Sequence, residues 1–199
     1  MSAFNEEAIR TLEHVEDMVK RLKANGGEIK SDIFTFKSCG EKNAGIGVFA
    51  KEDRPLVKGE LLMQVPFSEC LSVERVIAYP PLAHVFKEQA GLIDYPDEIL
   101  AIGIMYAMSN QDVSCGWLDY LKACPVAEEM NTTIYWNDDE VEELKGCTVY
   151  HLTKMMLKQI DNDWETIHAQ FKEVYCDILG NITKDLYKWS LSMIYSRAV

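Results

Sequence analysis

The sequence lacks the features that mark membrane, secreted or metal-binding proteins. Its longest nearly continuous apolar stretch, Ile99 to Met108, is only about half of the ~20 residues that a transmembrane helix needs. The N-terminus carries Asn5, Glu6 and Glu7 in place of the basic residues that begin a signal peptide. No two of the six cysteines have the Cys-x-x-Cys spacing of zinc sites or thiol redox motifs. We therefore expect an intracellular protein, cytoplasmic or nuclear, with free thiols and no bound metal.

Basic residues are also scarce. The sequence has 20 Lys and Arg residues and 32 Asp and Glu residues, which gives a net charge of −12. Nucleic acids are held mainly through Lys and Arg contacts to phosphate, so this balance argues against a nucleic-acid partner. A basic protein substrate is the natural electrostatic complement, and we expect neither nucleic acid nor membrane as a partner. The sequence also has no Gly-x-x-x-x-Gly-Lys-Ser/Thr phosphate loop and no Gly-x-Ser-x-Gly nucleophile elbow.

The spacing of apolar residues predicts an α+β fold. Ile9, Leu12, Val19 and Leu22 follow a helical period, and Asn25-Gly26-Gly27 is typical of a helix end. From about residue 29 to Pro66 the period changes to two, which indicates a small antiparallel sheet. Its expected strands are Ile33–Phe36, Ile46–Phe49 and Leu61–Val65.

After Pro66 the pattern is helical to the end of the sequence. Pro80 and Pro96 are expected to start helices, because proline is tolerated in a first helical turn. The helix after Pro96 is apolar nearly all round and should be buried, and Thr183 is a plausible cap for a last helix. A short β module followed by a helical majority is therefore the expected architecture.

The stretch Ala44 to Ala50 is the most informative part of the β module. Gly45 and Gly47 lie two residues apart and precede an apolar strand, so they permit a tight turn or a close approach of another group to the backbone. Taken alone, the pattern is more commonly explained by a hairpin bulge, and Gly-x-Gly also occurs by chance. The stretch is not a dinucleotide fingerprint, because a third glycine and a following helix are absent.

The order of motifs along the chain is more specific than any single motif. After the Gly-x-Gly stretch come, in order, Lys58–Leu62, Val65-Pro66, Trp117–Leu121, Cys124-Pro125, Thr132–Trp136, Leu144–Thr148, Tyr187–Ser190 and Tyr195–Ala198. The series resembles the SET-domain protein methyltransferases of the Rubisco large-subunit methyltransferase type, which include the actin-histidine methyltransferase. The resemblance runs from about Phe34 to the last residue.

The resemblance implies a cofactor site and a division of the chain. In that family the Gly-x-Gly turn and the arginine of a Ser-Arg-Ala-Phe motif contact S-adenosylmethionine, which maps onto Ala44, Gly45, Ile46, Gly47 and Arg197. A guanidinium suits the carboxylate of that cofactor. The division would be an N-terminal helix (1–27), a SET β module (28–71), a helical insertion (72–180) and the start of the C-terminal SET portion (181–199).

The sequence also departs from the family pattern. The family's Asn-His segment and active-site tyrosine lie beyond the Ser-Arg-Ala-Phe stretch, and this sequence has Val199 in place of the phenylalanine. Some members have arginine where Phe49 stands. We therefore expect no catalytic residue in these 199 residues and no catalysis by them alone.

Three interpretations remain open at this stage. The first is the N-terminal part of a protein-lysine or histidine methyltransferase that uses S-adenosylmethionine. The second is a catalytically dead SET-like interaction module, for which open sheet edges predict self-association. The third is an unrelated α+β domain with chance matches.

Overall fold

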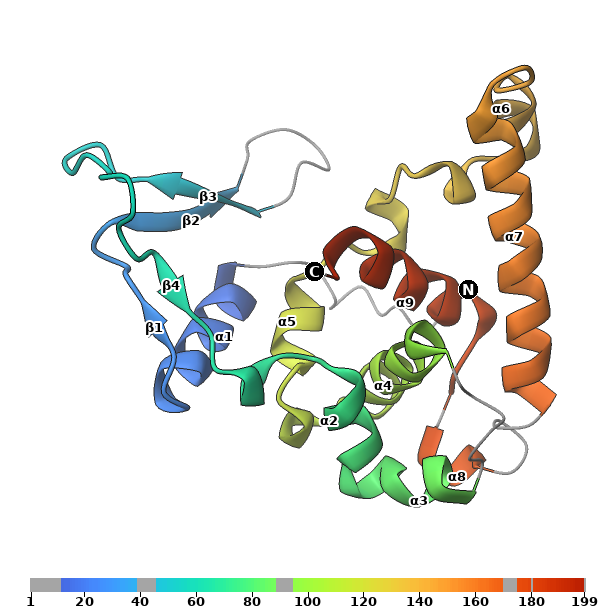
Figure 1. Cartoon of the computed structure of the whole chain (residues 1–199), viewed down its shortest axis with the longest axis horizontal. Coiled ribbons are helices and arrows are strands. Elements are labelled where there is room, and N and C mark those ends of the chain that lie inside the picture. The colour runs from blue at the N-terminus through green and yellow to red at the C-terminus, as the bar shows by residue number, and fades with distance from the viewer. Residues whose placement is uncertain (1–11, 39–45, 89–94, 170–174, 180, 199) are drawn as a thin grey trace.

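The chain folds into a β module and a larger helical body, which confirms the α+β class (Figure 1). The structure, a computed structural model, describes residues 12–38, 46–88, 95–169, 175–179 and 181–198. In Figure 1 the β module lies at one side of the molecule, and the helices fill the rest. None of the described helices is long and apolar enough to cross a membrane.

The first described element is helix α1 (Leu12–Ala24). It ends as predicted at Asn25-Gly26, where Gly26 adopts a left-handed φ of +88° that favours glycine. The apolar side of α1 buries Val15 and packs Val19 and Leu22 against the β module. On its other side, the Arg21 Nε donates to Glu69 Oε2 at 3.2 Å. The helix thus joins the two parts of the molecule.

The β module contains two separate antiparallel sheets of two strands each. Strands β2 (Phe34–Ser38) and β3 (Ile46–Ala50) form a hairpin in which Phe34 pairs with Ala50 and Ser38 with Ile46. Strand β1 (Glu28–Ile29) pairs with β4 (Met63–Gln64). The two predicted strands at residues 33–36 and 46–49 are confirmed.

The third predicted strand, Leu61–Val65, is shorter than expected and does not extend the hairpin. Only Met63 and Gln64 are in strand conformation, and they pair beside the end of α1. Gly27 makes this approach feasible, because a Cβ there would lie 2.7 Å from the Leu22 carbonyl oxygen and 3.2 Å from that of Gln64. The pairing of β4 with β1 therefore depends on a close backbone approach at Gly27, which strand propensity does not predict.

The helical body begins after the β module and continues to residue 198. Its α-helices are α2 (Val73–Ala78), α3 (Pro80–Glu88), α4 (Pro96–Asn110), α5 (Leu118–Ala123), α6 (Asp138–Glu142), α7 (Thr148–Ile167), α8 (Cys176–Leu179) and α9 (Lys184–Arg197). The described residues also form short 3-10 turns, η1 (Phe67–Glu69) before α2, and η2 (Val113–Cys115), η3 (Ala127–Glu129) and η4 (Thr133–Tyr135) between later helices. The predicted helix starts at Pro80 and Pro96 are confirmed, as is the Thr183 cap, whose hydroxyl accepts from Leu186 N at 3.1 Å.

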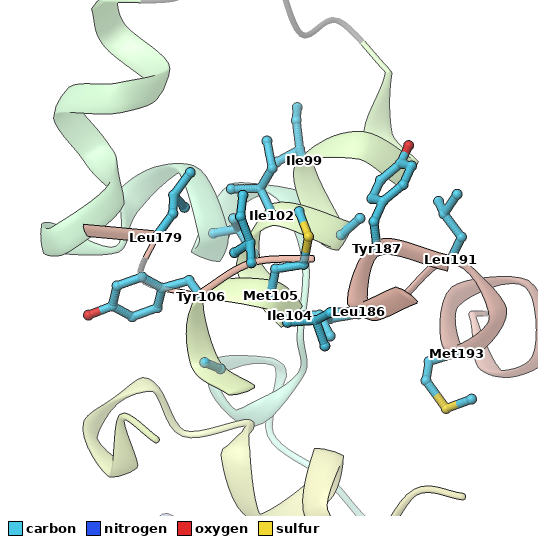
Figure 2. Close-up of a cluster of buried hydrophobic side chains, with 14 of the residues drawn as sticks. Ile99, Ile102, Ile104, Met105, Tyr106, Leu179, Leu186, Tyr187, Leu191 and Met193 are labelled. Carbon is cyan, nitrogen blue, oxygen red and sulfur yellow. The ribbon is translucent and has the colours of Figure 1, made fainter. Parts of the chain in front are cut away.

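Helix α4 forms the centre of the helical core. Its residues 101–107 are buried on every side, as the sequence predicted for an all-round apolar helix. Figure 2 shows the side chains of Ile102 and Met105 facing those of Leu186 and Tyr187 from α9. The same core continues through α2, α5 and α7, so α9 is held by the helices that precede it.

Candidate functional site

The β2–β3 hairpin carries the first part of the predicted site. Ile46 and Gly47 begin β3, opposite Ser38 and Lys37 of β2, and both are partly buried. The other two predicted residues, Ala44 and Gly45, lie outside the described residues. The structure therefore supports a hairpin that ends at the Gly-x-Gly stretch, and the contact of that stretch with a cofactor stays a prediction.

Arg197 stands at the C-terminal end of α9. Between Leu186 and Ile194 every residue of the helix except the half-buried Lys188 is buried, and the helix becomes exposed at Tyr195. The Arg197 guanidinium therefore lies in solvent at the end of a rigid helix. The last turn is closed by a hydrogen bond from Ala198 N to the Ile194 carbonyl at 2.8 Å. An exposed guanidinium on a fixed helix can bind a carboxylate through two parallel hydrogen bonds.

Tyr120 of α5 is a neighbour of Arg197 that was not among the residues predicted from the sequence. Burial raises the pKa of the Tyr120 phenol, Cys124 adds to the rise, and the positive charge of Arg197 opposes it. The tyrosine remains 38% exposed. Arg197 at the end of α9 therefore lies close enough to Tyr120 of α5 to act on it electrostatically. The Trp117–Leu121 motif was the available signal, because it contains Tyr120.

A hydrogen-bonded carboxylate fixes the segment that leads into α5. Asp112 accepts from the hydroxyls of Tyr79 at 2.6 Å and Tyr106 at 2.9 Å, and from Ser114 N at 2.9 Å. Burial alone would raise the pKa of Asp112, but these hydrogen bonds outweigh burial and lower it to about 2. Burial, followed by the Asp112 hydrogen bond, raises the pKa of Tyr79 to about 12. The cluster ties α4 to the turn before α5.

Trp117 anchors the start of α5 from the other side. It is buried, its Nε1 donates to the Gly103 carbonyl at 3.4 Å, and the Arg75 guanidinium lies 5.2 Å from the centre of its ring. Together with the Asp112 cluster, this packing fixes the start of α5, the helix that carries Tyr120.

The two predicted halves of the site come from distant parts of the chain. In Figure 1 the ends of β2 and β3 at residues 38 and 46 point toward the side on which α9 ends. No hydrogen bond joins Arg197 to Ile46 or Gly47, the hairpin residues of the site that the structure describes. Their common contact with one ligand stays a prediction.

Comparison with curated proteins finds protein methyltransferases. The chain is 22% identical over 199 residues to the [fructose-bisphosphate aldolase]-lysine N-methyltransferase of Arabidopsis thaliana, covering 92% of this chain and 39% of that protein. It is 30% identical over 135 residues to ribosomal lysine N-methyltransferase 4 of Saccharomyces cerevisiae, covering 66% and 26% respectively. It is 23% identical to the actin-histidine N-methyltransferase of Xenopus tropicalis, covering 93% and 31%. A scan against protein-family models gives no match.

Comparison with solved structures finds the same group. Rubisco LSMT bound to AdoMet matches with a TM-score of 0.76 at 20% identity, covering 94% of this chain and 41% of that one. The SET domain of LSMT bound to lysine and AdoHcy matches with a TM-score of 0.75 at 19% identity, covering 94% and 39%. The chain thus spans well under half the length of the relatives it matches.

The structural matches define the fold. The fold is that of a partial SET domain, the fold of a class of protein methyltransferases. The proteins that the chain is similar to include a Rubisco large-subunit methyltransferase and an actin-histidine methyltransferase, the group that the motif series resembles.

Proposed function

We propose that the chain is the N-terminal part of a protein N-methyltransferase that transfers a methyl group from S-adenosylmethionine to a lysine, or alternatively a histidine, of a protein. The observation that carries the proposal is the fold match to the LSMT SET domain that was solved with AdoMet and with lysine and AdoHcy. The cofactor supplies an electrophilic methyl group on a sulfonium sulfur.

The residues present fit such a cofactor. Arg197 offers an exposed guanidinium for the carboxylate of its methionine part, and Tyr120 lies within electrostatic range of that guanidinium. Ile46 and Gly47, with Ala44 and Gly45 before them, would offer backbone groups, since glycines let a ligand approach the main chain. We assign no catalytic residue within these 199 residues.

The division of the chain given above forms part of this proposal. The hairpin and its neighbours (28–71) would contribute the cofactor turn, the helices of 72–180 would be an insertion, and α9 in 181–199 would bring Arg197 to the site. The core supports this role for α9, because α4 of the insertion and α9 pack directly against each other.

Charge supports a basic protein as the substrate. Residues 28–66 carry six acidic and six basic side chains, whereas residues 67–199 carry 21 acidic and 10 basic ones. The negative charge of the chain is thus concentrated in the helical body, where it would attract a basic substrate and repel nucleic acid.

Calorimetry with S-adenosylmethionine tests the cofactor proposal. The titration is run on residues 1–199 and on a form extended beyond Val199. We expect heat of binding from the extended form, and weak or no binding from residues 1–199 alone, because contacts to the cofactor would be incomplete. If the extended form gives no heat of binding, the cofactor proposal is wrong.

A second candidate function is a protein-binding module without catalysis. It is favoured by the apolar surface of the β module, where Val48, Phe49, Leu61, Leu62, Met63, Val65 and Phe67 are all exposed, Phe67 to 68%. Unpaired strand edges and exposed apolar residues are typical of surfaces that bind another chain. This candidate predicts self-association of residues 1–199 in light scattering, and a clean monomer that binds no exposed-surface dye argues against it.

A further inference from the structure

Two arginines from distant parts of the chain converge on one glycine. Arg21 lies on α1 and Arg75 on α2, and α1 packs against α5, which begins just after Gly116. A Cβ on Gly116 would lie 2.8 Å from Arg21 Nη2 and 3.4 Å from Arg75 Nη2. The tips of the two guanidinium groups therefore lie close to the same point.

Both guanidinium groups are held in place through their other nitrogens. Arg21 Nε donates to Glu69 Oε2 at 3.2 Å, and Arg21 Nη1 donates to the Val113 carbonyl at 3.3 Å. Arg75 Nη1 donates to the Cys70 carbonyl at 2.9 Å. Because these bonds already orient both side chains, a ligand that binds them costs little further side-chain entropy.

The two Nη2 atoms remain available to a ligand. In the part of the chain that the structure describes, neither Arg21 Nη2 nor Arg75 Nη2 has a hydrogen-bond acceptor, and both atoms reach solvent. The side chain of Arg21 is 29% exposed, and Arg75 is partly buried. Two oriented donors at the surface are thus unused by the fold.

The charges of this group do not balance. Glu69 forms an ion pair with Arg21, whereas no carboxylate among the described residues forms one with Arg75. Asp112, in the turn before α5, already accepts hydrogen bonds from two tyrosines and Ser114. The excess positive charge, at a partly desolvated position, attracts an anion.

The arrangement suits a phosphate group. A phosphate monoester carries a charge of about −2 at pH 7 and has three acceptor oxygens, so it can accept from both Nη2 atoms at once. Hydrogen bonds from a guanidinium to such oxygens are about 2.8 Å long. Gly116 leaves the space beside the two arginines free of a side chain. A carboxylate offers only two oxygens and one charge.

We propose that Arg21 and Arg75 form an oxyanion site at Gly116 that binds a phosphate group across α1, α2 and the start of α5. The phosphate is either the free ion or the phosphate of a phosphorylated side chain, because both present the same oxygens to the arginines. The inference goes beyond the proposed function and is independent of it, since neither Arg197 nor the β2–β3 hairpin takes part.

An NMR titration of residues 1–199 with inorganic phosphate tests the site. The signals followed are the backbone amides of Gly116 and Trp117, and sodium chloride keeps the ionic strength constant. We expect these signals to shift and to saturate as phosphate is added, and acetate at the same concentrations to shift them less. If phosphate causes no saturable shift in the wild type, or if acetate binds equally well, the proposal is wrong.

Arg75→Gln is the main variant, because its loss leaves no carboxylate unpaired among the described residues. It should weaken phosphate binding by at least about ten-fold, as for loss of a charged hydrogen bond, and Arg75→Lys should be intermediate. Lys158→Gln is the matched control, because it removes the same charge from the exposed side of α7, across the molecule from α1 (Figure 1). Equal affinities for Arg75→Gln and Lys158→Gln would overturn the site.

A phosphoserine peptide and its serine counterpart distinguish the two sources of phosphate. Tighter binding of the phosphoserine peptide than of inorganic phosphate, with no shift from the serine peptide, would assign the site to a phosphorylated protein. Equal affinities for the phosphoserine peptide and inorganic phosphate would assign it to the free ion. A shift of the same signals by the serine peptide would contradict recognition of phosphate.

Discussion

Replacing Asp112 by asparagine tests how the segment before α5 is held. The carboxylate accepts hydrogen bonds from the Tyr79 and Tyr106 hydroxyls and from the backbone and hydroxyl of Ser114, at distances of 2.6 to 2.9 Å. Asparagine keeps the size of the side chain but loses the charge and one acceptor oxygen. We expect Asp112→Asn to lower the free energy of unfolding, because these hydrogen bonds are made to a charged group.

The magnitude follows from the pKa. A fall from the ordinary 3.8 to about 2 corresponds to at most about 2.5 kcal/mol, since one pKa unit is worth about 1.4 kcal/mol. Asp112 is partly exposed, so solvent screening reduces this to about 1 kcal/mol. The lowered pKa means that the stabilisation is complete above pH 3.8 and is lost as the pH falls through about 2.

The assay is urea unfolding of the wild type and Asp112→Asn at several pH values. At pH 7 we expect the variant to be less stable by about 1 kcal/mol, which lowers Tm by about 2–4 °C for a chain of this length. At pH 3 the difference should be about half as large, because the native carboxylate is then still mostly ionised whereas the unfolded one is mostly protonated. A difference that is absent at pH 7, or equally large at pH 2, refutes the reasoning.

Three further substitutions test the packing around the site. Gly103→Ala should destabilise the fold by about 1–2 kcal/mol despite the better helix propensity of alanine, because the new Cβ would lie 2.6 Å from Cγ2 of the buried Val76. In the same urea unfolding assay, adding Val76→Ala to Gly103→Ala should restore part of the lost free energy of unfolding. Gly116→Ala should lower Tm, because Gly116 has a φ of +84° and a Cβ there would lie 2.8 Å from Arg21 Nη2; an unchanged Tm contradicts this. Thr183→Ala should cost about 1 kcal/mol by removing the cap on Leu186 N, whereas Thr183→Ser should cost little in the same unfolding assay.

The sequence predicted the elements of this fold whose signals are local. Glycine after α1, proline at the starts of α3 and α4, and the Thr183 cap each act through the backbone of the residue itself, and each was confirmed. The all-round apolar pattern likewise predicted the burial of α4. Such signals depend on a few neighbouring residues, so they can be recognised without knowledge of the tertiary contacts.

The features that escaped prediction depend on contacts between distant residues. The pairing of β4 with β1 depends on the space at Gly27, and Tyr120 joins the candidate site only because α9 brings Arg197 to α5. The cofactor residues came from resemblance to a family, since a lone Gly-x-Gly and a terminal arginine have common structural explanations.

The central claim is that Arg197 holds S-adenosylmethionine, and calorimetry on the form extended beyond Val199 tests it most directly. Arg197→Ala should weaken cofactor binding by at least about ten-fold, as for loss of a charged hydrogen-bond pair, and Arg197→Lys should be intermediate because it keeps the charge but not the planar fork. Lys158→Ala, on the exposed side of α7, removes the same charge and should leave the affinity unchanged. Equal affinities for the wild type and Arg197→Ala would contradict the account.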